Sequence, residues 1–257
     1  MTPGFAFVDR GTGPAVVFQH GLGGDEAQVA EVFPDADARW RRLTLDCRGQ
    51  GKSAADPQNR YAIRTFAEDV LRLADERKVE RCVVGGISMG AAIALHLAVN
   101  HPGRVTALIL ARPAWLFDEA PANMAPFAEV AQLLTMPDGL AAFDAGDTAA
   151  TLAREAPANL SSLRGFFTRP NPEVAAALLG AIAVDGPGVT RAQAAALALP
   201  TLVIGHGRDL VHPLAYAETL AATIPGAELA RITPKATDAG RHAEEFRAAV
   251  RRFLTSL

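Results

Sequence analysis

The ten residues Val83-Val84-Gly85-Gly86-Ile87-Ser88-Met89-Gly90-Ala91-Ala92 decide the fold of this chain. An apolar run typical of a buried strand enters Gly-x-Ser-x-Gly and continues at once into an apolar helical pattern. Gly86 and Gly90 allow a sharp turn and close packing of strand and helix, so the Ser88 hydroxyl projects from the bend. The stretch predicts a nucleophilic serine. The alternative is a small serine that only packs a tight turn.

A second glycine-rich turn, Gln19-His20-Gly21-Leu22-Gly23-Gly24, follows an earlier apolar run. The backbone N–H groups of such a turn can converge on one point, as an oxyanion hole requires. We expect the amides of Leu22 and Met89 to be the donors of this hole.

The segment Asp46-Cys47-Arg48-Gly49-Gln50-Gly51-Lys52-Ser53 ends in Gly-Lys-Ser, as a phosphate-binding P-loop does. A P-loop also needs a glycine five residues before its second glycine, and this chain has Asp46 there. The P-loop hypothesis therefore fails.

The two cysteines, Cys47 and Cys82, are too few for a disulfide framework or a cysteine-rich zinc site. We expect neither a cofactor nor a metal.

The composition argues against several classes of protein. The 257 residues include 25 basic and 28 acidic side chains, with a formal net charge of −3 and no basic stripe, so a nucleic-acid partner is not expected. The first residues lack the regions of a secretory signal, and no apolar window approaches the roughly 18 residues of a membrane span. These features predict a cytoplasmic protein that acts on a small molecule without a membrane, with a homodimer as an open possibility.

Short apolar runs alternate with helical patterns, which predicts a doubly wound, mostly parallel α/β sheet covered on both faces. The candidate strands are Phe5–Asp9, Ala15–Gln19, Arg42–Leu45, Cys82–Ile87, Val105–Leu110, Thr201–Ile204 and Leu229–Thr233. No strand pattern occurs between Ala111 and Pro200. We therefore expect residues 113–198 to form a helical cap inserted into a core of residues 1–112 and 199–257. The alternative is a pair of covering helices with no role in the site.

These motifs together make the chain resemble the α/β-hydrolase family over nearly its whole length. The stretches HGLGG, DCRGQGKS and GISMG match that family's oxyanion turn, its D-x-R-G-x-G-x-S loop and its nucleophile elbow, in the same order. The resemblance implies an eight-stranded, mostly parallel sheet, a helical cap after the sixth strand and a Ser-Asp-His triad. Serine at position 88 argues against the haloalkane dehalogenase and epoxide hydrolase branches, which need a carboxylate nucleophile.

Asp209 follows the strand Thr201–Ile204, where the family places its acid, and its alternative is a turn aspartate. The base is less clear, because no histidine stands in the loop after Thr233 where the family pattern has one. His242 keeps the chain order and is our first choice, although it could be a surface residue of the terminal helix. His212, three residues after Asp209, is the rival. A third possibility is that no histidine serves as the base.

Three of the remaining histidines are assigned other roles. We expect His20 to shape the oxyanion turn and His96 and His101 to be structural residues of the helix after Ser88.

Two function hypotheses follow. The first is a serine hydrolase that cleaves a small-to-medium apolar ester, thioester or lactone through an acyl-enzyme on Ser88, with C–C bond hydrolysis or cofactor-free perhydrolysis on the same site as variants. The second is a non-catalytic binding protein that keeps the fold but lacks a working base. Arg112 and Arg164 are candidates to meet a substrate carboxylate. The apolar side chains that could line the cavity or attach the cap are Trp115, Leu116, Phe117, Met124, Phe127, Phe166 and Phe167.

Overall fold

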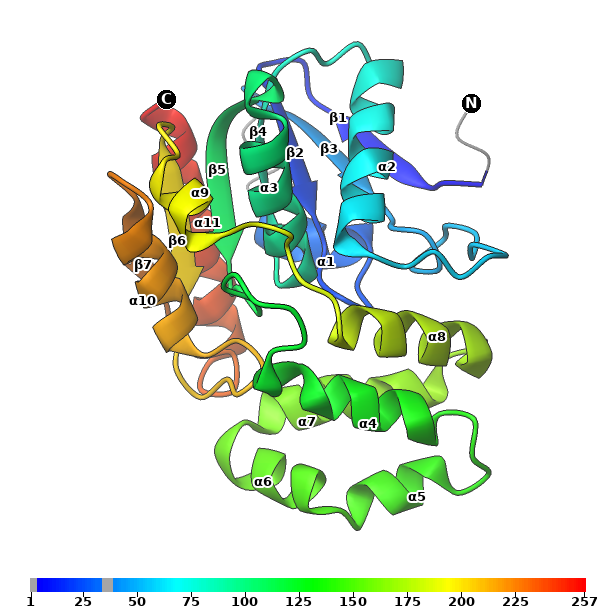
Figure 1. Cartoon of the computed structure of the whole chain (residues 1–257). Coiled ribbons are helices and arrows are strands. Elements are labelled where there is room, and N and C mark those ends of the chain that lie inside the picture. Colours follow the sequence, from blue (N-terminus) through cyan, green and yellow to red (C-terminus); the bar gives the residue numbers. More distant parts are fainter. Residues whose placement is uncertain (1–3, 34–38) are drawn as a thin grey trace.

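The computed structural model describes residues 4–33 and 39–257. Seven strands form one sheet in the order β1-β3-β2-β4-β5-β6-β7, and β1 runs antiparallel to β3 while the other neighbours are parallel (Figure 1). The strands are β1 (Phe7–Arg10), β2 (Ala15–Gln19), β3 (Arg41–Leu45), β4 (Cys82–Ile87), β5 (Val105–Ala111), β6 (Thr201–Gly205) and β7 (Glu228–Arg231).

Each strand coincides with an apolar run that predicted it, with ends shifted by at most two residues. The eight strands implied by the family resemblance are one too many for the residues that the structure describes. The three described residues before β1, Gly4 to Ala6, are too few for a further strand.

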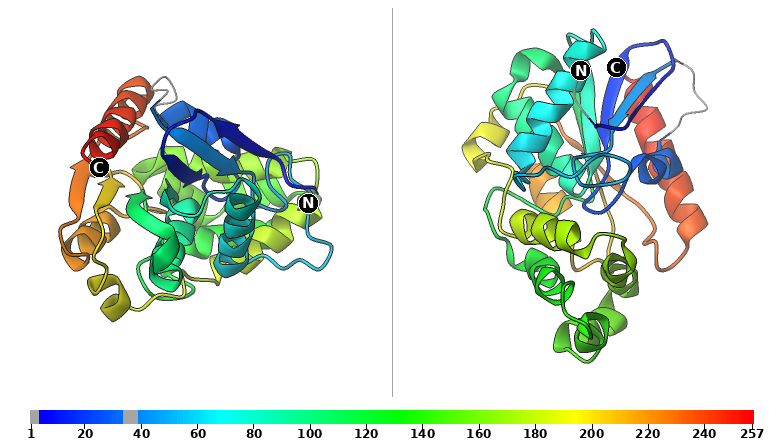
Figure 2. Two further views of the ribbon diagram at one scale, coloured as in Figure 1. Left: turned by 90° about the horizontal axis from the view of Figure 1, so that it is seen from above. Right: turned by 90° about the vertical axis from the view of Figure 1, so that its right-hand side faces the viewer.

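Helices cover both faces of the sheet (Figure 2). One face carries α2 (Ile63–Glu76), α3 (Met89–Asn100), α9 (Arg191–Ala195) and α10 (Leu214–Thr223), and the other carries α1 (Glu26–Val32) and α11 (Ala239–Thr255). A short 3-10 turn, η1 (Pro102–Arg104), connects α3 to β5. None of the described helices is both long enough and apolar enough to cross a membrane.

The strand residues alternate between two buried clusters, as expected for a sheet covered on both sides. Val84 and Leu108 face the helices α2 and α3, whereas Val83 and Ile109 face the side of α11. This alternation fixes the register of β4 and β5, and it places the carboxyl ends of the parallel strands along one edge of the sheet.

Between β5 and β6 the described chain contains helices and no strand. These are η2 (Ala122–Met124), α4 (Ala125–Leu133), α5 (Gly139–Asp144), α6 (Asp147–Glu155), α7 (Pro157–Arg164), η3 (Gly165–Thr168), α8 (Pro172–Ala183) and then α9. Helices α4 to α8 form a separate layer beside the sheet (Figure 1), while α9 returns to pack against α3 and α10. We call residues 113–198 the helical insertion. Its two ends are tied together by the Trp115 indole, which donates to the Asp185 carbonyl at 2.9 Å.

Candidate active site

Ser88 lies at the bend between β4 and α3 in a backbone conformation that L-residues rarely adopt, with φ +56° and ψ −111°. Its amide donates to the carbonyl of Ala111 at 2.9 Å, which anchors the bend to β5. A methyl group on Gly90 would collide with the carbonyl of Gln19, so only glycine allows α3 to approach β2 this closely. The strain at Ser88 is therefore held by the strands on both sides.

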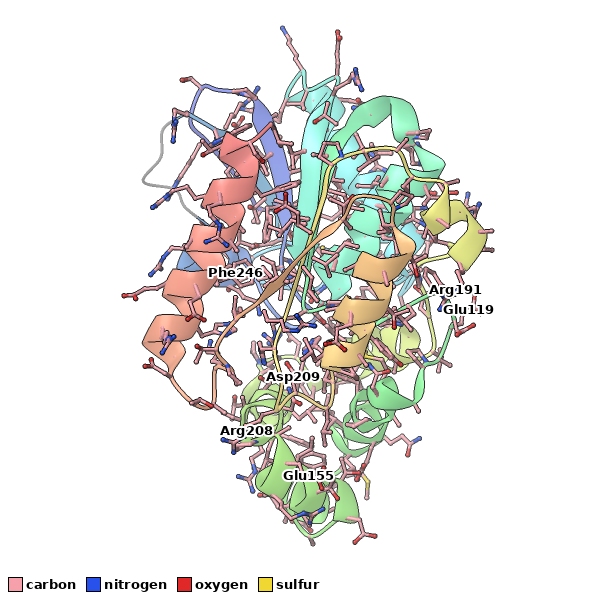
Figure 3. All side chains as sticks on the ribbon, turned by 90° about the vertical axis from the view of Figure 1, so that its left-hand side faces the viewer. Glu119, Glu155, Arg191, Arg208, Asp209 and Phe246 are labelled. Atoms are coloured by element: carbon pink, nitrogen blue, oxygen red, sulfur yellow. The ribbon has the colours of Figure 1, made fainter. Side chains whose placement is uncertain are left out.

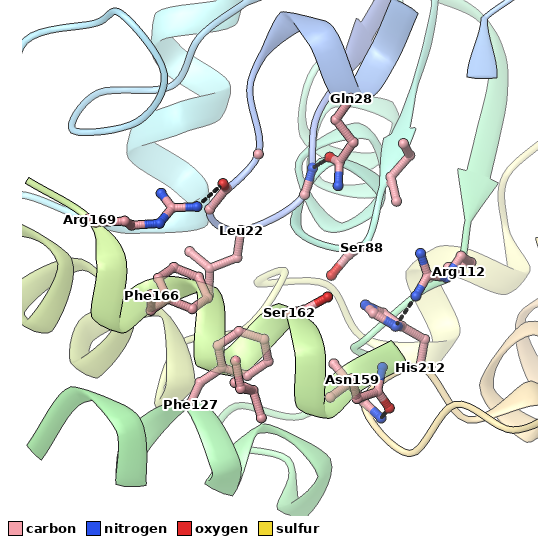
Figure 4. A pocket seen from close by; sticks show the side chains of 16 residues that line it. Leu22, Gln28, Ser88, Arg112, Phe127, Asn159, Ser162, Phe166, Arg169 and His212 are labelled. Atoms are coloured by element: carbon pink, nitrogen blue, oxygen red, sulfur yellow. Dashed lines mark hydrogen bonds between the residues drawn. The ribbon is translucent and has the colours of Figure 1, made fainter. Parts of the chain in front are cut away.

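A cavity of about 200 Å³ lies in front of Ser88, between the edge of the sheet and the helical insertion (Figure 4). The core and its loops contribute Gly21, Leu22, Gly23, Gly24, Gln28, Ile87, Ser88, Arg112, Val211 and His212. The insertion contributes Phe127, Asn159, Ser162, Leu163, Phe166 and Arg169. Among these lining residues there are two arginines and a histidine, and no aspartate or glutamate.

The glycine-rich turn after β2 leaves one of its amides free. The amide of Gly21 donates to Gln28 Oε1 at 2.7 Å, that of Gly23 donates to Gln50 Oε1 at 2.6 Å, and that of Gly24 donates to the Gly21 carbonyl at 2.9 Å. The amide of Leu22 finds no acceptor within the described part of the chain, and neither does that of Met89, the residue after Ser88. The Leu22 amide of the turn and the Met89 amide at the start of α3, the two expected to stabilise an oxyanion, are therefore both free of acceptors among the described residues.

His20 is fully buried beneath this turn. Its Nδ1 donates to the Gly21 carbonyl at 2.8 Å, and its Nε2 accepts the amide N–H of Cys47 at 2.9 Å. Burial lowers the pKa of His20, which suits a neutral ring with one donor and one acceptor. His20 therefore joins the turn after β2 to the loop after β3.

The loop Asp46–Ser53 supports the site from below. Asp46 accepts the amides of Glu26 at 2.8 Å and Lys52 at 3.0 Å, so its carboxylate joins the start of α1 to this loop. Arg48 is buried and forms a bidentate pair with Asp69, with nitrogen–oxygen distances of 2.8 and 2.7 Å. The loop in turn presents Gln50 to Gly23.

Asp209 and His212 lie together on the loop after β6, and Figure 3 shows Asp209 at the junction of the sheet and the insertion. The Nδ1 of His212 lies 2.9 Å from each oxygen of the Asp209 carboxylate. The His212 amide also donates to Asp209 Oδ1 at 3.0 Å. Asp209 therefore orients both the ring and the backbone of His212, which lines the same cavity as Ser88.

Two further residues hold Asp209. Arg112, which adopts a positive φ of 46° just after β5, donates to Asp209 Oδ2 from Nη2 at 2.7 Å and from Nε at 3.1 Å. Asn159 of α7 donates to Asp209 Oδ1 at 2.9 Å, and its own oxygen accepts the amides of Leu210 and Val211. The helical insertion therefore helps to shape the loop that carries Asp209, a role for Asn159 that no local sequence pattern signalled.

The electrostatics of this group favour a charged acid and a neutral histidine. Burial acts to raise the pKa of Asp209, but the charges and hydrogen bonds of His212 and Arg112 outweigh it and hold the pKa well below its ordinary value. Burial lowers the pKa of His212, Arg112 lowers it further, and Asp209 opposes both. A neutral imidazole with a carboxylate on Nδ1 is the form that can accept a proton at Nε2.

His242, our first choice of base from the sequence, lies elsewhere. It is 3% exposed at the start of α11, so the alternative of a surface histidine is wrong. Its Nδ1 donates to the Thr233 carbonyl at 2.9 Å, and its ring packs edge-on against His206 with centroids 5.1 Å apart. His242 is not among the residues that line the cavity, so the structure brings Ser88, Asp209 and His212 together and leaves His242 behind that group.

Of the other candidate residues, some line the cavity and some do not. Arg112 lines the cavity but is paired with Asp209, whereas Arg164 is half-exposed, pairs with Asp144 at 2.8 Å and lies outside the lining. Of the apolar side chains singled out in the insertion, Phe127 and Phe166 line the cavity. The others pack into the large apolar cluster that joins the insertion to the core.

Comparison with known proteins identifies the family of this chain. A model of the alpha/beta hydrolase fold family matches residues 14–238. The chain belongs to this family. It is 27% identical over 223 residues to the putative carbamate hydrolase RutD of Klebsiella pneumoniae, a match that covers 84% of this chain and 81% of that protein. A 90-residue segment is 36% identical to the magnesium-chelatase 30 kDa subunit of Rhodobacter capsulatus, spanning 35% of this chain and 32% of that protein.

Among solved structures, the alpha/beta hydrolase fold is shared with the enol-lactonase from Burkholderia xenovorans LB400 at a TM-score of 0.74 and 27% identity. That comparison covers 98% of this chain and 96% of the other. RutD is named a putative carbamate hydrolase and the solved neighbour is an enol-lactonase, and this chain is a hydrolase of the alpha/beta fold.

Proposed function

We propose that this alpha/beta hydrolase cleaves a small ester, thioester or lactone through an acyl-enzyme on Ser88, with His212 as the base and Asp209 as the acid that orients it. One observation carries the proposal: His212 and Ser88 line one cavity, and the Nδ1 of His212 lies 2.9 Å from the buried Asp209 carboxylate. Figure 4 shows the Ser88 hydroxyl and the His212 ring directed into the same space.

The reaction follows from the roles of these groups. The Ser88 oxygen attacks the substrate carbonyl carbon while its proton passes to His212 Nε2, and the oxyanion accepts the amides of Leu22 and Met89. Collapse of this intermediate breaks the bond to the leaving group, which takes the proton from His212. Water then gives a proton to His212 and attacks the acyl-enzyme, which releases the carboxylic acid and restores the Ser88 hydroxyl.

The choice of His212 keeps the order Ser-Asp-His along the chain but moves the base from the loop after the last strand to the loop after β6. Acid and base come from one loop, three residues apart, and the loop after β7 holds Pro234, Lys235 and Ala236 where the family resemblance led us to look for a histidine. The Asp209 carboxylate is already engaged by the His212 ring, the His212 amide, Arg112 and Asn159. His242 makes no contact with this carboxylate among the hydrogen bonds and ion pairs of the described residues.

The cavity supports a small substrate. A volume of about 200 Å³ admits a short acyl group or a small ring, and Phe127, Leu163 and Phe166 give it an apolar wall. The likeness to an enol-lactonase and to a putative carbamate hydrolase supports a carbonyl bonded to oxygen or nitrogen as the group attacked.

The test compares three variants with wild type in the hydrolysis of p-nitrophenyl acetate and butyrate. We expect Ser88→Ala to abolish hydrolysis and labelling by a fluorophosphonate probe. His212→Ala should lower kcat by about 10³-fold or more, the usual cost of losing a triad member. His242→Ala should leave kcat within a few-fold of wild type, because His242 does not reach the cavity.

The reverse ranking of the two histidine variants would move the base to His242. Equal and small losses in both, together with the absence of fluorophosphonate labelling at Ser88, would instead favour the non-catalytic binding protein.

A further inference from the structure

Arg169 occupies the wall of the cavity across from His212 (Figure 4). It follows η3 in the helical insertion, and its guanidinium lies over the Phe166 ring at 4.4 Å from the centroid. Its Nη2 donates to the carbonyl of Gly23 in the oxyanion turn. Gly23 has a φ of +76°, and a methyl group there would collide with Phe166, so glycine is required where the insertion meets the turn.

The charge of Arg169 has no acidic partner at ion-pair distance among the residues that the structure describes, unlike that of Arg112, which pairs with Asp209 at 2.7 Å. The acidic group that acts on Arg169 from farther away is Asp25, whose carboxylate already accepts the amides of Ala27 and Gln28. Burial lowers the pKa of Arg169, which shows that its surroundings oppose the charge. A guanidinium nonetheless remains protonated in proteins, so the cavity wall carries a positive charge that forms no ion pair with the described residues.

We propose that Arg169 binds a carboxylate of the substrate, so that this enzyme acts on esters or lactones bearing a free carboxylate a few bonds from the carbonyl that Ser88 attacks. This inference rests on the proposed function and adds the class of substrate. A half-buried, partly desolvated charge is costly until it is paired, and an anionic substrate would supply the partner that the described residues do not.

The shape of the Arg169 site favours a carboxylate. Phe166 covers one face of the guanidinium and Gly23 takes one N–H, which leaves donors in the guanidinium plane for the two oxygens of a carboxylate. The single positive charge of Arg169 also balances the single negative charge of one carboxylate. Because the same guanidinium holds Gly23, the bound carboxylate would lie next to the turn that presents the Leu22 amide.

The test measures a preference between two substrates of equal length, monomethyl glutarate and dimethyl glutarate, by the kcat/KM for methanol release. We expect wild type to prefer the monoester. Arg169→Met should reduce that preference by about 10- to 100-fold, as the loss of a charge-assisted hydrogen bond implies, chiefly through KM for the monoester. Arg169→Lys should retain part of the preference, because it keeps the charge.

The matched control is Arg164→Met, which removes an arginine of the same insertion that pairs with Asp144 outside the cavity and should leave the preference unchanged. If Arg169 only braces the oxyanion turn, Arg169→Met will lower kcat for both esters equally and the inference is overturned. A wild type without preference for the monoester also overturns it. Hydrolysis of both esters that survives Ser88→Ala would instead reject the proposed function.

A second measurement covers the case in which Arg169→Met does not fold. Glutarate and its uncharged diamide are compared as inhibitors of p-nitrophenyl acetate hydrolysis by wild type. Competitive inhibition by glutarate alone supports the carboxylate site, and equal inhibition or none by both compounds contradicts it.

Discussion

Asp209 is shared between His212 and Arg112, and this sharing sets the proton affinity of the proposed base. The Nη2 of Arg112 lies 2.7 Å from Asp209 Oδ2 and 3.1 Å from His212 Nδ1. Burial lowers the pKa of His212, the Arg112 charge lowers it further, and only Asp209 acts to raise it. The base is therefore weaker than an imidazole whose carboxylate partner is not shared with a cation.

Replacing Arg112 with glutamine should shift the pH dependence of the reaction. The base must be neutral, so kcat/KM rises with pH through the pKa of His212, which lies below its ordinary value of 6.5 in wild type. Without the positive charge the imidazolium is less disfavoured, the pKa rises and the acid limb moves to higher pH. The measurement is kcat/KM for p-nitrophenyl acetate from pH 4.5 to 8.5.

Arg164→Gln is the control for this shift, since Arg164 is half-exposed and paired with Asp144. An acid limb that stays in place in Arg112→Gln, or moves to lower pH, would contradict the assignment of His212 as the base.

At the scale of elements, helix α7 contributes to a loop of the core. Asn159 is 4% exposed and joins three groups of that loop, the Asp209 carboxylate and the amides of Leu210 and Val211, at distances of 2.9 to 3.2 Å. An asparagine can serve as donor and acceptor at once, which a carboxylate cannot do. The insertion therefore positions the acid as well as covering the cavity.

Asn159→Ala should lower kcat by roughly 10- to 100-fold, because a loop displaced by even a fraction of an ångström misaligns the base. KM should change less, since most of the cavity wall is intact. Ser161→Ala is the matched control, because Ser161 is an exposed residue of the same helix outside the cavity. A kcat for Asn159→Ala equal to that of the control would show that the core alone fixes the loop.

At the scale of the whole molecule, burial lowers the pKa of four of the six histidines, His20, His206, His212 and His242. The pKa of His206 falls to about 4, chiefly through burial and then through Arg112. His206 is 5% exposed, and its Nε2 has no hydrogen-bond partner among the described residues. The Nε2 atom lies 3.7 Å from Asp209 Oδ2. The fold thus keeps several imidazoles neutral in its interior.

The free energy of unfolding should therefore decrease as pH falls from about 6.5 to 4. In that range the unfolded chain binds protons that the folded chain excludes, so the stability is complete above pH 6.5 and is lost toward acid. His206 alone accounts for roughly 3 kcal/mol at most. The free energy of unfolding, measured by urea denaturation at several pH values across this range, should depend less steeply on pH in His206→Asn than in wild type. The control His101→Asn, at the end of α3, should keep the wild-type slope, and the same slope in all three proteins would contradict the prediction.

The sequence determined the features that depend on short-range patterns. Seven strands were predictable because their residues alternate between two buried faces, and the bend at Ser88 because only glycine fits at Gly90. The helix α1 escaped prediction because its seven residues bury only Val29 and Val32, which is too few to show a period. The order of the three motifs was enough to identify the family that the comparison then confirmed.

Only the tertiary structure decided which histidine reaches the cavity and which of the cavity's two arginines forms no ion pair with the described residues. His212 and His242 are both plausible along the chain, but one lies on the loop after β6 beside Asp209 and the other donates to Thr233 behind it. Asn159 and Arg169 come from the insertion and meet core residues about 50 and 146 positions away. A strand or a tight turn is set by neighbours in sequence, whereas a charge, a pKa or a catalytic distance depends on groups that only the folded chain brings together.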